Sequence, residues 1–319
     1  MRKFVSVSIL IIVLAVVGFA VLNRQWVRDM YVVQTTDVQP VADSLKQRLF
    51  LTDHADFLYH ASLPEVLQAG EFNRSCADVQ REQSIVLGCY TRQRFFVYDV
   101  DDERLSGVKE VTAAHELLHA VYERLSPQDK NKIDSLVLEV AKTITDERFQ
   151  ATLAQYQQTE PDQIPNELHS ILATEIKELP SELELHYSKY FMDRSKLVAY
   201  ATQYAETFTS LDDQINQYDS KLSALKTSIT SLEESLKAKQ VALNSAQQEM
   251  QQLRASGQIE EYNGMVHGYN QQIRDYNQDV ARLKQTIEEY NQLVEQRNSL
   301  ATTQNDLAQE LNSNYQPLQ

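Results

Sequence analysis

The sequence predicts an α+β domain that lies between an N-terminal transmembrane helix and a C-terminal antiparallel helical hairpin. Three features support this fold class: a long uncharged apolar run, short β-branched segments followed by amphipathic helices, and heptad repeats. We expect an anchor over residues 1–23, a linker over 24–39, a compact domain over 40–195, a coiled-coil hairpin over 196–314 and a tail over 315–319.

The anchor is predicted by the apolar run from Phe4 to Leu22, which as a helix would rise ~28 Å and so match the hydrocarbon core. Arg2 and Lys3 precede this run, and the positive-inside bias therefore places the N-terminus in the cytoplasm and the later domains outside it. A cleaved signal peptide ending near Gly18-Phe19-Ala20 is the alternative.

Within the compact domain, strands are expected before helices. A mixed segment over residues 40–72 is followed by SIVLGCY and RFFVYDV, two β-branched and aromatic runs that predict a β-hairpin. A helix then carries VTAAHELLHAVYERL, and Ser126 and Pro127 are expected to begin the next helix as its N-cap and first residue. A third helix is predicted from Asn166.

Cys76 and Cys89 are the only cysteines in the chain, and no local histidine accompanies them as a metal ligand. In an exported domain such a pair is expected to form a disulfide, which would stabilise the fold by about 3 kcal/mol. Two buried reduced thiols are the alternative.

The C-terminal region carries two heptad seams on either side of a break at Ser256-Gly257. The first seam contains Ile215, Leu222, Ile229, Leu236, Leu243 and Met250, and the second contains Ile259, Val266, Ile273, Val280, Ile287 and Val294. The break favours an antiparallel hairpin with arms of about 80 Å. Two independent helices in a parallel oligomer are the alternative, because heptads alone do not fix direction.

The segment HELLH is the feature that predicts chemistry. On a helix, His115 and His119 lie one turn apart on the same face, where both imidazoles can bind one tetrahedral Zn²⁺. Glu116 points to the adjacent flank, where it can act as a general base toward a zinc-activated water. Two satisfied core histidines on an amphipathic helix are the alternative.

A third zinc ligand is expected on a later helix, since Tyr122 and Leu125 occupy the positions where the long HExxHxxGxxH motif has glycine and histidine. Glu167 and Glu175 are the two candidates. They lie eight positions apart and hence on one face. Small residues on this face, such as Ser170, would allow close approach to the HELLH helix.

HELLH followed by NELHS resembles the gluzincin metallopeptidases, in which a second helix supplies a glutamate ligand followed three residues later by a small residue. Glu167 and Ser170 occupy these places, so the resemblance makes Glu167 the preferred third ligand over Glu175. The run ELHSILATEIKELPSELELHYSKYF is similar to the Mlc-titration-factor-like and lethal-factor-like branches, and the resemblance covers roughly residues 85–191. It implies a zincin-like domain. Ile171 departs from the pattern, because many gluzincins have an acidic residue there.

His186 and Tyr187 are further catalytic candidates, because either could donate a hydrogen bond to the oxyanion of a tetrahedral intermediate. Packing of this aromatic pair in the core is the alternative.

Together these features predict a membrane-anchored, extracytoplasmic zinc-dependent peptidase acting on protein or peptide substrates. The alternative is an inactive zincin-like envelope protein whose coiled coil is structural, adhesive or recruits a protein partner. Nucleic acid is not expected as a partner, because a chain with a net charge of −15 would be repelled by phosphates.

Overall fold

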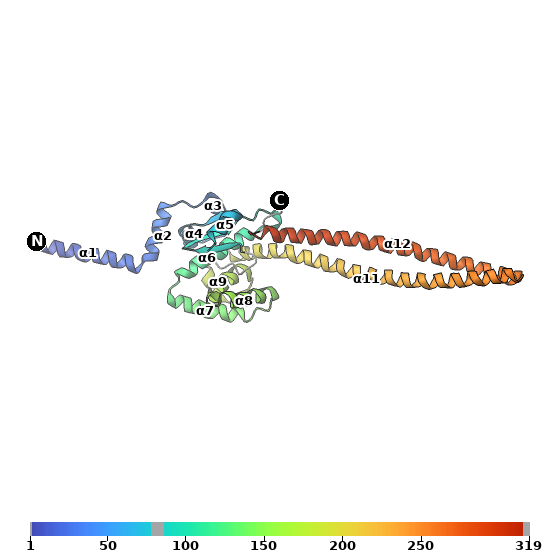
Figure 1. Cartoon of the computed structure of the whole chain (residues 1–319). Coiled ribbons are helices and arrows are strands. Elements are labelled where there is room, and N and C mark those ends of the chain that lie inside the picture. Colours follow the sequence, from blue (N-terminus) through green and yellow to red (C-terminus); the bar gives the residue numbers. More distant parts are fainter. Residues whose placement is uncertain (1, 78–85, 315–319) are drawn as a thin grey trace. The chain divides into compact units, whose positions relative to one another are not determined.

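The protein was analysed as a computed structural model, which describes residues 2–77 and 86–314, with side chains from Ile12 onward. The chain divides into two compact units (Figure 1). The first comprises Met1–Thr207 with Leu307–Gln319, and the second comprises Phe208–Asp306.

The first unit is mainly helical. Its helices before the sheet's hairpin are α1 (Arg2–Leu22), α2 (Arg24–Thr35), α3 (Pro40–Lys46), α4 (Asp53–Ala61) and α5 (Ala69–Ser75). After it come α6 (Val108–Arg124), α7 (Pro127–Ala141), α8 (Glu147–Thr159), α9 (Ile164–Glu175), α10 (Ser181–Tyr187) and the start of α11 (Arg194–Ala255). As predicted, Ser126 caps α7, and its hydroxyl accepts a hydrogen bond from the Asp129 amide at 3.1 Å.

The described sheet has three strands, β1 (Glu65–Leu67), β2 (Gly88–Thr91) and β3 (Arg94–Tyr98), in the order β1-β3-β2. β3 is central, pairing in parallel with β1 and antiparallel with β2. The predicted hairpin is confirmed for its described residues. Arg92 and Gln93 form its turn with φ of 52° and 61°, as a two-residue turn that follows the strand twist requires.

Helix α6 lies between the sheet and the helical group α7–α9, and it also contacts α3 and α4 (Figure 1). Ala113, Ala114, Leu117 and Leu118 are fully buried on α6, so this helix forms the centre of the core. It begins after Gly107, whose φ of 99° is a conformation that favours glycine. Tyr200 also leaves no room for a side chain there, because an added Cβ would lie 2.9 Å from the Tyr200 Cβ.

Two sequence-based expectations are wrong. The α+β class overstates the sheet, because the described chain is predominantly helical and its strands have three to five residues. Much of the segment over 40–72 forms helices because its apolar residues recur at helical spacing, as with Ala55, Leu58 and Tyr59 on α4. Among the described residues, no helix is long and apolar enough to cross a membrane, which contradicts the predicted anchor and single-pass topology.

The predicted disulfide is confirmed. Cys76 and Cys89 are bonded, with their Cα atoms 6.0 Å apart, and both residues are buried. The bond joins the end of α5 to β2. It therefore fixes the edge strand of the sheet to the helix that covers it.

The second unit consists of the remaining part of α11 and of α12 (Ile259–Glu310) up to Asp306, joined by a turn at Gly257 with φ of 79°. The long helical region predicted here is confirmed. The two arms run antiparallel, as three cross-arm contacts establish. Arg297 Nε donates to Asp219 at 3.0 Å, Lys239 Nζ to Asp279 at 2.6 Å, and Gln304 Nε2 to Asp212 at 2.5 Å.

Each of these pairs is equidistant from Gln258 to within two residues, so the contacts fix one register along the hairpin. We predict that cysteines replacing Asp219 and Arg297 crosslink within one chain through a short bismaleimide. Cysteines at Asp219 and Asp279 should not, because residue 279 lies about 27 Å along the arm from residue 297. Peptide mapping of monomeric and dimeric gel bands checks this, and crosslinks found only between chains would contradict the hairpin.

Candidate metal centre

The helical spacing of HELLH places His115 and His119 together on one face of α6. Their ring centroids are 4.8 Å apart in an edge-to-face arrangement. His119 is buried and His115 is half-buried, whereas Leu117 and Leu118 between them face the core. The same helix therefore fills the core with one face and presents both imidazoles on another.

Glu167, on the first turn of α9, faces both imidazoles. One carboxylate oxygen lies 3.5 Å from His115 Nε2 and the other 3.6 Å from His119 Nε2. These separations exceed those of ordinary hydrogen bonds. Two ligand atoms bound to one tetrahedral Zn²⁺ at about 2.0–2.2 Å lie about 3.4 Å apart, which is close to both separations. The three side chains therefore have the spacing of a ligand set around one cation.

Two further residues orient these side chains. His119 Nδ1 donates to the Asn166 side-chain oxygen at 3.0 Å, which fixes the tautomer and leaves Nε2 as the atom facing Glu167. Tyr156 on α8 donates a hydrogen bond to the Glu167 carboxylate. Burial opposes ionisation of Glu167, but His119, His115 and Tyr156 outweigh it and lower its pKa to about 2.

Glu116 lies on the flank of the histidine pair. Its Oε2 is buried and has no hydrogen-bond partner among the described residues, and burial raises the pKa of this carboxyl to about 8. Ligand atoms of Glu116, His115 and His119 all lie within 4.8 Å of one another, so Glu116 is also close enough to contact a cation. Glu167 is the stronger candidate ligand, because its two oxygens face the two Nε2 atoms.

Gly88 on β2 provides the space that Glu116 occupies. A Cβ on Gly88 would lie 2.5 Å from Glu116 Oε1 and 2.6 Å from Thr112 Cγ2, so only glycine fits beside this carboxylate. The sequence contained no signal for this role, because the contact joins residues on different elements.

These side chains line an open cleft of about 550 Å³. One wall is β2, from Gly88 to Thr91, and the other is the connection from α8 to α9, which includes Glu160 and Asp162. Glu116, His119 and Glu167 are buried, whereas Asp162 is exposed, so the candidate ligands lie deep in the cleft.

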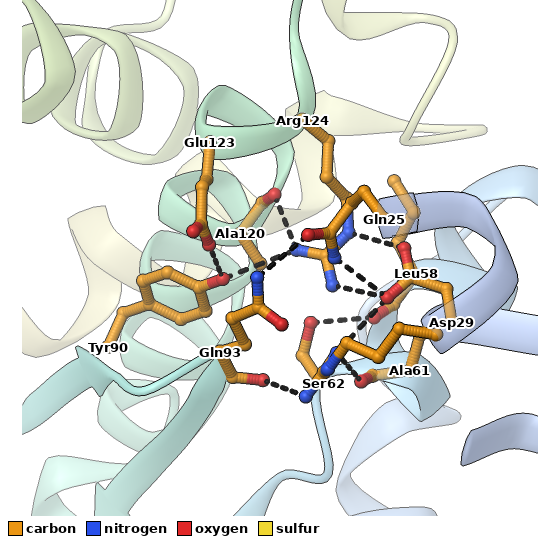
Figure 2. Close-up of polar contacts among 11 residues, drawn as sticks. Gln25, Asp29, Leu58, Ala61, Ser62, Tyr90, Gln93, Ala120, Glu123 and Arg124 are labelled. Carbon is orange, nitrogen blue, oxygen red and sulfur yellow. Dashed lines mark hydrogen bonds and ion pairs between the residues drawn. The ribbon is translucent and has the colours of Figure 1, made fainter. Parts of the chain in front are cut away.

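The end of α6 and the turn after β2 are held by a polar network (Figure 2). Arg124 donates two hydrogen bonds of 2.9 Å to the buried carboxylate of Asp29 on α2, and a third of 2.8 Å to the Ala120 carbonyl oxygen. Gln93, in the turn after β2, donates to Gln25 on α2 at 2.7 Å. Helix α2 thus ties the edge strand to the helix that carries the histidines.

The structure does not bring the other predicted site residues to the cleft lining. Glu175 lies at the last residue of α9 and is exposed, and Glu167 is the one that pairs with both histidines. Tyr187 is buried, and its hydroxyl donates to the His169 carbonyl oxygen at 2.8 Å. The Nε2 atoms of His186 and His169 are 2.9 Å apart, and burial lowers the pKa of His186 to about 4.

Comparisons with protein-family models, curated proteins and solved structures found no match. The gluzincin resemblance therefore stays a prediction, based on HELLH and NELHS.

We predict that Gly88→Ala destabilises the first unit by about 1–3 kcal/mol, because the added methyl group must displace Glu116 or Thr112. Urea unfolding of the metal-free protein measures this effect. Gly70→Ala is the matched control: its Cβ would meet only the end of Arg74, at 3.8 Å, and it should be neutral or stabilise by up to about 1 kcal/mol. Equal stabilities of the two variants would contradict the close contact with Glu116.

Asn166→Ala should weaken Zn²⁺ binding about 10–100-fold, because His119 loses the acceptor that fixes its tautomer. Competition with a chromogenic chelator measures the affinity. Asn131→Ala, an exposed change on α7, is the control and should leave affinity unchanged. An Asn166 variant with wild-type affinity would rule out this orienting role.

Proposed function

We propose that the protein is a zinc-dependent peptidase with His115, His119 and Glu167 as metal ligands and Glu116 as general base. The observation that carries this proposal is the pair of 3.5 and 3.6 Å separations between Glu167 and the two Nε2 atoms. A second observation supports it. Glu116 Oε2 is buried and has no partner in the part of the chain that the structure describes, as expected of a group whose partner is a water or substrate.

A zinc ion held by these ligands would polarise the substrate carbonyl and lower the pKa of water. Its charge would also lower the pKa of the neighbouring Glu116 carboxyl, which burial alone raises, so that Glu116 can accept a proton. The other steps belong to the chain's own groups. Glu116 takes a proton from the attacking water and delivers it to the leaving amine, for which its position beside the histidines is suited. Gly88 leaves room for this carboxylate, and Asn166 and Tyr156 form hydrogen bonds to the ligands His119 and Glu167.

The cleft favours an extended peptide as substrate. β2 forms one wall and is an edge strand, paired with β3 on one side and with no other described strand. The edge of β2 that no described strand pairs with can accept a peptide by strand addition, in which backbone hydrogen bonds hold the substrate in an extended form. The scissile bond would then pass over Glu116 and the histidine pair.

Glu116→Gln should keep one zinc per chain and lower peptide hydrolysis by at least about 100-fold, because it removes the base and leaves the ligands intact. His115→Ala should lose zinc and hydrolysis together. Elemental analysis and cleavage of a quenched-fluorescent peptide library measure the two properties. Protein purified without chelators that holds no stoichiometric zinc would contradict the proposal and favour the inactive, coiled-coil-based alternative.

A further inference from the structure

Gly88 and Tyr90 on β2 rest on α6 and also border the cleft. They lie two residues apart and therefore on one face of the strand. An added Cβ on Gly88 would meet Glu116 of α6. The Tyr90 hydroxyl contacts Glu123 and Arg124, about two turns further along the same helix. Contacts at these two points determine where β2 lies along α6.

The same two residues direct their main-chain groups to the outer edge of the strand. The Tyr98 amide donates to the Leu87 carbonyl oxygen at 2.8 Å, so these residues are a hydrogen-bonded pair of the antiparallel ladder. Such pairs alternate with non-hydrogen-bonded ones, and the N–H and C=O groups of Gly88 and Tyr90 therefore point away from β3. A peptide added to β2 would bind these groups, so a shift of Tyr90 would misplace them.

Tyr90 is held by a network of charged groups that reaches α2 (Figure 2). Its hydroxyl donates to the Glu123 carboxylate and accepts a hydrogen bond from Arg124 Nη1 at 3.3 Å. Burial raises the pKa of this phenol, so the hydroxyl keeps the proton that it donates. Arg124 is fixed in turn by two hydrogen bonds of 2.9 Å to the buried Asp29. A link therefore runs from α2 through Arg124 to the strand that borders the cleft.

We propose that Tyr90 is a positioning residue for the peptide-binding edge of the cleft, and that Asp29 controls its position through Arg124. The proposal rests on the peptidase function, since it concerns how that same site holds its substrate. Loss of this link should weaken peptide binding and leave zinc affinity unchanged, because the metal ligands are on α6 and α9. Helix α2 thereby affects substrate binding although Asp29 is outside the described cleft lining.

The test measures peptide affinity and zinc affinity in the same variants. A fluorescein-labelled peptide that the wild-type protein cleaves is titrated with zinc-loaded Glu116→Gln protein by anisotropy, and chelator competition gives the zinc affinity. Adding Tyr90→Phe should weaken peptide binding about 3–10-fold, as expected for the loss of one hydrogen bond, with zinc affinity unchanged. The matched control Tyr98→Phe, on the neighbouring strand and outside the described cleft lining, should change neither affinity.

Asp29→Asn tests the route from α2. It should weaken peptide binding by a similar factor, and combining it with Tyr90→Phe should weaken binding no further, because both changes break the same link. Arg124→Lys keeps the charge but loses the planar fork of donors, and it gives a second test of this route. With Glu116 intact, Tyr90→Phe should raise KM and leave kcat unchanged, since the strand binds substrate and transition state alike.

Unchanged peptide binding in Tyr90→Phe, or a loss of zinc affinity as large as the loss of peptide affinity, would overturn the positioning role. Additive losses in the combined variant would overturn the route through Arg124. Failure of the proposed function is distinguishable from these results. If the wild-type protein cleaves no peptide of the library, the peptidase function is wrong and this inference is wrong with it, whereas cleavage that does not depend on Tyr90 contradicts this inference alone.

Discussion

The packing of α9 against α6 is the interaction on which the candidate site depends. On α9, Ser170, Ala173 and Thr174 are completely buried, and their small side chains allow the backbones of the two helices to approach closely. Glu167, one turn before Ser170, is thereby brought to face both imidazoles of α6. A larger residue at 170 or 174 would separate the helices and move the carboxylate away from the histidines.

The second constraint is the buried pair of Arg124 and Asp29. An isolated buried charge is costly, but here Arg124 donates two hydrogen bonds to the Asp29 carboxylate (Figure 2). Gln25 and Arg28 each donate a further hydrogen bond to Asp29 Oδ1. The pair joins α2 to the end of α6. The disulfide holds β2 to the end of α5. Together, the ion pair and the disulfide fix the positions of β2 and α6, which line the cleft.

Local patterns predicted much of this site. The four-residue spacing in HELLH follows from helix geometry, whereas Glu167 was preferred over Glu175 because NELHS resembles the gluzincin motif, in which a small residue follows the glutamate ligand by three positions. Cys76 and Cys89 could be paired because the chain has no other cysteines. Antiparallel arms followed from a break between two heptad seams.

The remaining features depend on contacts between distant residues, which no single segment encodes. Gly88 is required because Glu116 occupies the space beside it, and Tyr156 acts through Glu167 from another helix. His186 and Tyr187 were predicted to be catalytic because either can donate a hydrogen bond to an oxyanion. In the fold, both side chains are buried and contact His169 instead. The strands were overestimated because short apolar runs fit a strand or a buried helix equally well.

X-ray absorption spectroscopy at the zinc edge tests the central claim most directly, because it reports which atoms surround the metal. The account predicts two imidazole nitrogens at about 2.0–2.1 Å and carboxylate oxygen at about 2.0–2.2 Å, and loss of this zinc signal in His119→Ala, as in His115→Ala. A spectrum without imidazole scattering, or one unchanged in His119→Ala, would show that zinc binds elsewhere and would contradict the assigned centre.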